Sequence, residues 1–462
     1  MTKKKRLKVL VFIDHDIIIR HFIKSGVFSE LAAKHDVLFC LISENYKNGA
    51  RIRTPLESLG LGDRLRRIEV DDYRQGKWAK LTHVSRLKWR PGQHMRHLRD
   101  FTRHAIGPGH VREYTFLSLP GVYHWFERKT LREIVAHPNT HLEKLFDEEL
   151  PDVVFHPSVL YGPLIHDLCC ITAERRIPMT AIMNSWDNPA SKANIYLALD
   201  RLLVWGEQTR DHAVKYLKIH PSNVTIFGAA QFDVYRNPAR VTRSEYERLH
   251  EIPSGSKILL YAGASKGADE FAHLCLLDEA VERGDFGEKT AVLYRPHPWG
   301  NGGKGGKRII DHPWRNVFLE LAGKPYLESL REGDQGITLA DYKDTIDTLS
   351  NVDAVISPLS TIILEAAMLG KPSICLLPYE EGAVHFNLAA GLAHFQEIYA
   401  WPEFLKARGV DELVPKAVEL MQRSRDTVLS ARLIELSNYF AQRFDEPYAS
   451  RLVTYAESLF RE

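Results

Sequence analysis

Cysteine is scarce in this sequence, and the few copies present form none of the usual motifs. The 462 residues contain five cysteines, an odd number, and neither a CxxC nor an HExxH motif occurs. A large chain with so few cysteines in mostly apolar surroundings is typical of a reducing compartment, where thiols stay free. These absences argue against a disulfide framework and against a structural zinc site.

Long hydrophobic runs and a net charge of either sign are also missing. Apolar stretches such as residues 37–42 are far shorter than the ~20 residues that a membrane-spanning helix needs. Lys and Arg number 61 and Asp and Glu 59, so the formal net charge is +2, whereas a dedicated nucleic-acid-binding protein would be distinctly basic. The basic start runs directly into a predicted strand, which a secretory signal would not do. We therefore expect a cytoplasmic protein without a nucleic-acid partner.

The sequence does contain a repeated alternation of short apolar runs with helix-like segments. Several runs are apolar without alternation, as expected for strands that are covered on both faces of a parallel sheet. Length and pattern together predict an α/β protein with two doubly wound, Rossmann-like domains that face each other across a cleft. The predicted strands are residues 8–13, 36–41, 152–155, 179–183, 201–204 and 223–227 in the first half, and 257–262, 290–294, 336–339, 353–356 and 373–376 in the second.

The strand pattern restarts near residue 252 and thereby divides the chain. We predict an amino-terminal domain over residues 1–235 and a carboxyl-terminal domain over residues 236–440. A basic insertion over residues 73–115 interrupts the first domain, with seven Lys or Arg between His83 and Glu113 against two acidic residues. Two interpretations stay open: a solvated helical insertion, or a basic surface that binds an anionic acceptor or the lipid headgroups at the inner face of the plasma membrane.

Residues 353–372 have the pattern of a strand, a tight turn and a helix. Ser357, Ser360 and Thr361 lie where this helix begins, and Glu365 follows one turn later. Unpaired N–H groups at the start of a helix suit a phosphate, and a carboxylate one turn further on is within reach of a ribose diol. The alternative interpretation is that Ser360 or Thr361 only caps the helix.

Two other segments of the second half end predicted strands with groups that bind phosphate. Arg295 and His297 belong to an Arg-Pro-His-Pro sequence, in which the guanidinium suits a diphosphate and the imidazole suits a phosphate oxygen or an acid role. Gly263 permits close backbone approach, and Ser265 and Lys266 offer donors next to it. We predict that all five contribute to a phosphate-binding strand edge.

Residues 263–267 also match the G-x-S-x-G pattern of a nucleophile elbow. This raises a serine hydrolase as an alternative function, with Ser265 as the nucleophile and a later acid and histidine such as Asp353 and His385. The pattern is short, and a hydrolase would leave Arg295 and the Ser360–Glu365 segment without a role. We therefore rank the hydrolase behind a phosphate-binding enzyme.

The first predicted strand leads into a polar cluster that includes His15, Asp16 and Arg20. A carboxylate and a histidine at the end of a strand are candidates for acid or base catalysis. The alternative is an ordinary polar loop in which Asp16 caps a helix.

A second polar loop follows the predicted strand 179–183. Its polar side chains surround one tryptophan, an arrangement that suits sugar recognition by hydrogen bonds and ring stacking. A plain surface loop is the alternative. The predicted acceptor- or sugar-binding residues of this loop are Asn184, Trp186, Asn188 and Lys192, and Asp187 is a further candidate base.

Taken together, these segments resemble a known group of enzymes. The second half is similar to the nucleotide-binding domain of GT-B glycosyltransferases. Residues 295–298, the turn 357–361 and Glu365 resemble bacterial surface-polysaccharide transferases of capsule and lipopolysaccharide synthesis and CDP-glycerol glycerophosphotransferase-like enzymes. The resemblance implies transfer of a sugar or a polyol phosphate from an activated nucleotide to a hydroxyl of a glycan or lipid-linked acceptor. It also implies no cofactor and no obligatory metal, and a final helix over residues 441–462 that packs back on the first domain.

The resemblance assigns roles to the predicted residues. Arg295, His297, Ser360 and Thr361 would hold the phosphates of the donor, and Glu365 would hold its ribose. Fixed donors at this place stabilise the negative charge that develops on the leaving phosphate.

The base and the stereochemistry are left open. Asp16, His15 or Asp187 would take the proton of the acceptor hydroxyl. Many retaining GT-B enzymes carry two glutamates eight residues apart, but Ser373 stands at the second of these positions. Two alternatives share the two-domain plan: a non-hydrolysing nucleotide-sugar epimerase, and a scaffold that binds a nucleotide without turnover.

Overall fold

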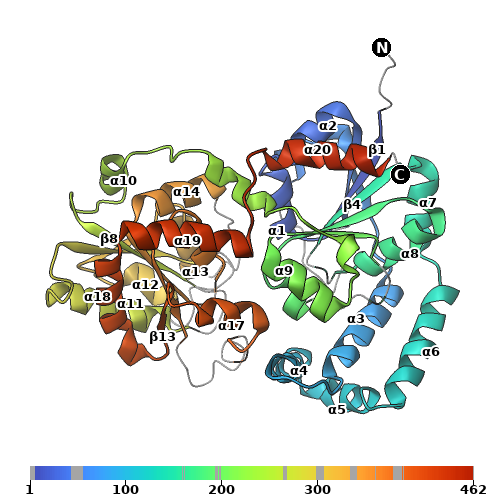
Figure 1. The fold of residues 1–462 in the computed structure, drawn as a ribbon, viewed down its shortest axis with the longest axis horizontal. Helices are drawn as coiled ribbons and strands as arrows, with labels where there is room; N and C mark the ends of the chain where they lie inside the picture. Colours follow the sequence, from blue (N-terminus) through green and yellow to red (C-terminus); the bar gives the residue numbers. More distant parts are fainter. Residues whose placement is uncertain are drawn as a thin grey trace. The chain divides into compact units, whose positions relative to one another are not determined.

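The computed structural model of the protein describes residues 6–42, 56–158, 160, 162–192, 196, 199–263, 268–297, 306–332, 341–358, 360–377, 388 and 390–460. The chain divides into two units, each of which contains a parallel sheet with helices packed around it (Figure 1). Unit 1 comprises Met1–Asp233 and Phe440–Glu462, and unit 2 comprises Val234–Tyr439. The predicted fold class, two doubly wound α/β units, is confirmed.

Unit 1 is built on a sheet whose described strands are all parallel and lie in the order β3-β2-β1-β4-β5-β6-β7. The order reverses between β1 and β4, which makes the carboxyl ends of these two strands the expected ligand-binding edge. Side chains of β4 and β5 are buried on both faces, which explains their continuous apolar sequences. The strands are β1 (Lys8–Ile13), β2 (Asp36–Ile42), β3 (Leu65–Ile68), β4 (Val153–Ser158), β5 (Met179–Met183), β6 (Arg201–Val204) and β7 (Val224–Ile226).

The last helix of the chain belongs to unit 1. Helix α20 lies beside α2 (Figure 1), where Ser450 Oγ donates to Glu30 Oε1 at 2.9 Å, and Arg451 Nη1 donates to the carbonyl oxygen of Phe227 at 3.0 Å. The α-helices of unit 1 are α1 (Asp16–Ile18), α2 (Ser29–Lys34), α3 (Asp72–Leu87), α4 (Gln93–Ile106), α5 (Pro108–Leu117), α6 (Val122–Ala136), α7 (Thr140–Glu149), α8 (Ile165–Arg175), α9 (Glu207–His212) and α20 (Tyr448–Leu459).

Helices α3 to α6 form an arm between β3 and β4 that is longer than the predicted insertion over residues 73–115. The arm is anchored by buried polar contacts with α8. Asp167 accepts hydrogen bonds from Arg74 Nη2 at 2.7 Å and from Trp78 Nε1 at 2.8 Å, and all three side chains are buried. Breaking a buried ion pair of this kind is strongly destabilising, so the arm is fixed to unit 1 at α3.

Unit 2 has a parallel sheet with the described strands in the order β10-β9-β8-β11-β12-β13. The order reverses between β8 and β11, so their carboxyl ends form the second expected binding edge. The strands are β8 (Lys257–Ala262), β9 (Thr290–Arg295), β10 (Val317–Leu319), β11 (Ala354–Pro358), β12 (Ser373–Leu376) and β13 (Leu405–Ala407). The described α-helices are α10 (Arg243–Leu249), α11 (Glu270–Glu282), α12 (Gly306–Asp311), α13 (Lys324–Glu332), α14 (Tyr342–Asn351), α15 (Ile362–Met368), α17 (Ala393–Ala400), α18 (Leu413–Arg423) and α19 (Thr427–Phe440).

Each face of the unit 2 sheet contributes to a separate apolar core. Leu259 and Tyr261 of β8 face the larger core, and Ile258 and Leu260 of the same strand face the other. The central strands that were predicted from apolar runs are therefore confirmed. The predicted strand 336–339 lies outside the described residues, and the described neighbour of β9 at that edge is β10.

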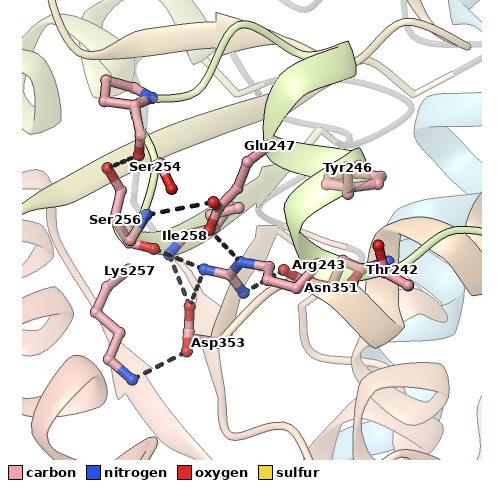
Figure 2. Close-up of polar contacts among 12 residues, drawn as sticks. Thr242, Arg243, Tyr246, Glu247, Ser254, Ser256, Lys257, Ile258, Asn351 and Asp353 are labelled. Atoms are coloured by element: carbon pink, nitrogen blue, oxygen red, sulfur yellow. Dashed lines mark hydrogen bonds and ion pairs between the residues drawn. The ribbon is translucent and has the colours of Figure 1, made fainter.

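The opposite, amino-terminal edge of this sheet is held by a network of charged side chains around Arg243 (Figure 2). Arg243 Nη2 donates to Asp353 Oδ2 at 2.9 Å and Nε donates to Glu247 Oε1 at 2.8 Å, while Lys257 Nζ lies 3.2 Å from Asp353 Oδ1. Burial acts to raise the pKa of Asp353, but the Ile258 N–H and the Arg243 guanidinium outweigh it, so the net pKa is lowered. Because Asp353 lies at this end of β11, it is remote from the carboxyl edge, where the sequence predicts the alternative hydrolase site.

Replacing Arg243 with alanine should destabilise unit 2 by on the order of 2 kcal/mol, because it leaves the buried Glu247 carboxylate without its cation. Since the pKa of Asp353 is lowered on folding, its contribution is present above its ordinary pKa of 3.8 and is lost as the pH falls below that value. Urea titrations at pH 7 and pH 3 should therefore show a smaller difference between parent and variant at pH 3. Arg283→Ala, which removes an exposed ion pair with Asp285, serves as the control and should change stability by less than about 0.5 kcal/mol.

Candidate functional site

Two predicted segments of unit 2 meet at the carboxyl edge of its sheet. Arg295 ends β9, and the segment from Ser360 to Glu365 follows β11 and forms the first turn of α15. The carboxylate of Glu365 is near enough to Arg295 to raise the pKa of the guanidinium. The sequence features predicted to form one site are therefore close together, beside the point where the strand order reverses.

A tyrosine that the sequence did not single out fixes Glu365 in this position. The hydroxyl of Tyr235 donates to Glu365 Oε2 at 2.5 Å, and Thr361 Oγ1 lies 3.4 Å from Glu365 Oε1. Burial and then the charge of Glu365 raise the pKa of Tyr235 far above its ordinary value, so the phenol keeps its proton. Glu365 is 7 % exposed and is thus an oriented carboxylate at the rim of the strand edge.

Arg295 points into unit 2 rather than outwards. Its side chain is 8 % exposed, Nη2 donates to Thr345 Oγ1 at 2.7 Å, and Nη1 lies 3.6 Å from Glu320 Oε1. Burial acts to lower the pKa of Arg295, but the charges of Glu320 and Glu365 outweigh this effect. The net pKa is raised, so the guanidinium stays charged. Arg295 therefore compensates the negative charges of Glu320 and Glu365 inside unit 2. Its direct bidentate contact with a diphosphate stays a prediction.

At the end of β8, the backbone of Gly263 lies close to the carboxylate of Glu270. A Cβ atom on Gly263 would lie 2.6 Å and 2.7 Å from the carboxylate oxygens of Glu270, which explains why a glycine is present. Glu270 is fully buried and accepts a hydrogen bond from Tyr294 Oη at 2.5 Å. Gly263 thus lets a buried acid pack against the first strand end of unit 2.

The remaining predicted donor residues lie partly outside the described part of the chain. Ser265 and Lys266 are outside it, as is His385 of the hydrolase alternative. His297 is half-buried two residues beyond β9, and Ser360 is half-buried just before α15. Their phosphate-binding roles remain predictions.

Unit 1 carries a buried acid and histidine at its own reversal point. Asp14 follows β1 directly and is 3 % exposed, and neither carboxylate oxygen has a hydrogen-bond partner on another described residue. His156 of β4 is fully buried, its Nδ1 lies 3.1 Å from the carbonyl oxygen of Phe12, and its Nε2 lies 3.8 Å from Asp14 Oδ2. The carbonyl fixes the proton on Nδ1, which leaves the Nε2 lone pair facing the carboxyl group of Asp14.

Burial sets the ionisation of this pair. It raises the pKa of Asp14 to about 7, against the opposing effect of a backbone N–H, and it lowers the pKa of His156 to about 4, against the effect of the Phe12 carbonyl. At neutral pH His156 is therefore uncharged, and Asp14 is close to half-protonated. A carboxyl group with such a pKa can accept and return a proton near neutrality.

The glycine at residue 162 closes over this acid. A Cβ atom there would lie only 2.2 Å from Asp14 Oδ2, so Gly162→Ala must displace the carboxylate. If Asp14 takes part in the reaction, this substitution should lower kcat by roughly 10–100-fold, because small displacements of a reacting group have effects of that size. Gly76→Ala in α3, where a Cβ atom meets nothing within 4 Å, is the matched control and should leave kcat unchanged. Equal steady-state rates for Gly162→Ala and Gly76→Ala would show that the space next to Asp14 does not matter for turnover.

The predicted residues after β1 and β5 also meet at this edge. His21 Nδ1 lies 2.7 Å from Asn184 Oδ1, which joins the two loops, and burial, with the charge of Arg20, lowers the pKa of His21 to about 3. The ring of His15 caps α1 by accepting from the Ile17 N–H at 3.0 Å. The helix cap that the sequence offered to Asp16 is thus made by His15.

The second polar loop is more interior than expected for a sugar-binding surface. Trp186 is 1 % exposed, its Nε1 donates to Gln208 Oε1 at 2.5 Å, and its ring packs edge-on against Phe440. Asn188 Oδ1 accepts from the Ser185 N–H at 2.8 Å and so shapes the loop. Asp187 is half-buried and accepts from Ser185 Oγ at 2.8 Å.

These contacts give Trp186 and Asn188 structural roles, and their sugar-binding roles stay predictions. The same holds for Lys192, whose side chain lies outside the described residues.

In the described part of the chain, no group of three His, Cys, Asp or Glu side chains is arranged to hold a metal ion. None of the described helices combines the length and apolar character that crossing a membrane requires.

Neither a protein-family model nor a curated protein sequence matches this chain. Solved structures do. A putative UDP-N-acetylglucosamine 2-epimerase from Listeria monocytogenes is similar over 99% of this chain and 97% of its own, with a TM-score of 0.54 and 12% identity. The MnaA protein of S. aureus, solved with UDP, is similar over 99% and 98%, with a TM-score of 0.52 and 11% identity.

The fold is of the GT-B type. A further solved structure, a UDP-N-acetylglucosamine 2-epimerase, has a TM-score of 0.51 and 13% identity over 99% of this chain and 96% of its own. Identities this low establish the fold alone, because one fold hosts many activities. The GT-B fold that the resemblance implied is thereby confirmed, and the likeness to surface-polysaccharide transferases and CDP-glycerol enzymes stays a prediction.

Proposed function

We propose that the protein is a glycosyltransferase that moves a sugar, or a polyol phosphate, from a nucleotide donor to a hydroxyl of a surface-glycan or lipid-linked acceptor. The observation that carries this proposal is the cluster of Glu365, Arg295 and the Ser360–Thr361 turn at the reversal point of the unit 2 sheet. Ligands of open α/β sheets bind at such a point.

The donor nucleotide is assigned to unit 2. Glu365, held by Tyr235, would accept hydrogen bonds from the ribose hydroxyls. The turn before α15 would approach the phosphates with its N–H groups and hydroxyls, with His297, Ser265 and Lys266 as further candidates. Arg295 would face the carboxylate of Glu365 with its positive charge from below. No cofactor is proposed, and the positive field for the leaving phosphate would come from these groups.

Acid–base chemistry is assigned to unit 1. In the transfer, the acceptor oxygen forms a bond to the transferred group, the bond from that group to the leaving phosphate breaks, and the acceptor proton passes to a base. Among the carboxylates and histidines of this edge, Asp14 has a pKa near 7 and faces His156 Nε2. We therefore place Asp14 ahead of His15, Asp16 and Asp187 as the base.

A non-hydrolysing nucleotide-sugar epimerase is the second candidate. It is favoured by the same Asp14–His156 pair, since a buried acid and base can exchange protons with a sugar carbon away from water. An epimerase needs no acceptor.

Product analysis separates the two candidates. The full chain would be incubated with a set of UDP-, CDP-, GDP- and TDP-sugars, with and without a glycan acceptor fraction, and the products resolved by anion-exchange chromatography. Free nucleotide that appears only with acceptor supports the transferase. An isomerised nucleotide sugar without acceptor supports the epimerase, and no turnover of any donor would contradict both.

A further inference from the structure

The arm of unit 1 carries an exposed surface with large apolar side chains. Phe116 is 60 % exposed near the end of α5, Leu119 is 46 % exposed in the turn that follows, and Trp125 is 60 % exposed in the first part of α6. In Figure 1 these helices extend from the sheet of unit 1 at the end of the arm. We call residues 112–135 of this arm, with their exposed side chains, the α5–α6 face.

The outer side of α6 combines this tryptophan with cations. Arg128, Lys129 and Arg132 follow Trp125 at spacings of three, four and seven residues, so the four side chains lie on one stripe of the helix. All four are exposed. The opposite stripe, which includes Tyr123, Phe126, Thr130 and Ile134, is buried against the rest of the arm. The outer stripe is therefore not needed for folding.

The arm is also locally basic. Residues 86–135 contain ten Lys or Arg against four Asp or Glu, although the whole chain has a net charge of only +2. Three of the four acids pair with a cation of the arm: Glu113 with Lys80 at 2.5 Å, Glu133 with Lys77 at 2.5 Å, and Asp100 with Arg103 at 3.0 Å.

The fourth acid, Glu127, accepts from Tyr123 Oη at 2.7 Å. No carboxylate of the described residues forms an ion pair with Arg112, Arg128 or Arg132, so their charges face solvent. A partner for this surface must therefore be negatively charged.

We propose that the α5–α6 face docks the protein on the surface of an anionic phospholipid bilayer. A helix with Trp and Phe beside Lys and Arg suits the boundary between lipid headgroups and acyl chains, where aromatic rings sit at headgroup level and cations bind lipid phosphates. The apolar residues at the turn supply the inserted part, and the cations supply attraction over a Debye length. An acidic protein surface is the alternative partner, because aromatic residues and Arg are also enriched at protein interfaces, and the vesicle experiment below separates the two.

Vesicle cosedimentation of the full chain tests this proposal independently of any enzyme activity. The parent should pellet with vesicles of phosphatidylcholine containing 30% phosphatidylglycerol, and not with phosphatidylcholine alone, and salt should weaken the binding. Arg128→Glu combined with Arg132→Glu should lower the partition coefficient at least tenfold. The matched control, Lys34→Glu combined with Arg248→Glu, reverses two exposed cations on other helices and should bind like the parent.

Insertion of the apolar residues is tested separately. Phe116→Ala combined with Trp125→Ala should also lower the partition coefficient at least tenfold while keeping its salt dependence, and circular dichroism should confirm that every variant is folded. Equal binding of the parent and the Arg128/Arg132 variant to anionic vesicles would overturn the proposal. It would equally be overturned by a parent that binds polyglutamate but no vesicles, because the partner would then be an acidic protein.

Discussion

Replacing Asp14 with asparagine should reduce turnover by about 10²–10⁴-fold, the range typical of a lost general acid or base. The amide has a similar size but cannot take a proton, so substrate binding should change little and kcat should change most. The measurement is the steady-state rate with whichever nucleotide sugar the product analysis identifies. Asp147→Asn, at an exposed ion pair with Arg175, is the matched control and should keep the parent rate.

The same substitution should stabilise the protein in alkaline solution. Burial raises the pKa of Asp14 from 3.8 to about 7, so the stability that the neutral carboxyl group contributes is complete below pH 3.8 and is lost as the pH rises towards 7. Since one pKa unit corresponds to about 1.4 kcal/mol, the ionised group costs on the order of 4 kcal/mol above pH 7. Asp14→Asn should therefore raise the melting temperature at pH 8.5 by several degrees and leave it nearly unchanged at pH 4.

The pH dependence of activity completes this prediction. If Asp14 is the base, kcat of the parent should rise with pH and level off above an apparent pKa near 7. A residual rate in Asp14→Asn that equals the rate of the Asp147→Asn control would remove Asp14 from the mechanism. Loss of activity in Asp16→Asn alone would return the role to the residue that the sequence suggested.

Replacing Glu365 with glutamine should weaken nucleotide binding by about 10–100-fold, because hydrogen bonds to a charged group contribute roughly 1.5–3 kcal/mol. The glutamine can still meet Tyr235, so the unliganded protein should melt near the parent temperature. Binding is measured as the thermal shift produced by UDP, CDP, CMP, GDP and TDP, since a ligand of the folded state stabilises it by mass action.

The control for this variant is Glu279→Gln on the exposed side of α11, which should keep the full nucleotide shift. An undiminished shift in Glu365→Gln would exclude the carboxylate from the nucleotide site. Arg295→Ala is a poorer test, because it would leave the buried carboxylate of Glu320 beside no cation and destabilise unit 2 whether or not a nucleotide binds there.

The central strands could be predicted from the sequence because their side chains are buried on both faces. Among the edge strands, β7 was also predicted, but β3, β10 and β13 were not. Strand β3 has the sequence Leu-Arg-Arg-Ile, and Arg66 pairs with Glu149 at 2.8 Å, so half of the strand is polar and lacks an apolar run. Strand β13 is only Leu405–Ala407 with a lysine at its centre. Their pairing depends on neighbouring strands rather than on their own composition.

The sequence predicted where the candidate site lies, but it predicted only some of the side chains that form it. The sequence marked the end of β1, but it could not tell that Asp14 turns inwards while His15 caps a helix, because the three polar residues there are consecutive. His156 gave a weak signal as the one ionisable residue within β4. Tyr235 and Glu320 meet Glu365 and Arg295 only through folding, since they are 130 and 25 residues away in sequence.

Amide hydrogen exchange with mass spectrometry tests the central claim most directly. The full chain would be labelled with and without the nucleotide that gives the largest thermal shift. The account predicts slower exchange in peptides that contain Ser360 to Glu365 and in those that contain Tyr235, with little change along α10 at the opposite edge of the same sheet. Protection confined to unit 1, or to the amino-terminal edge around Arg243, would contradict it.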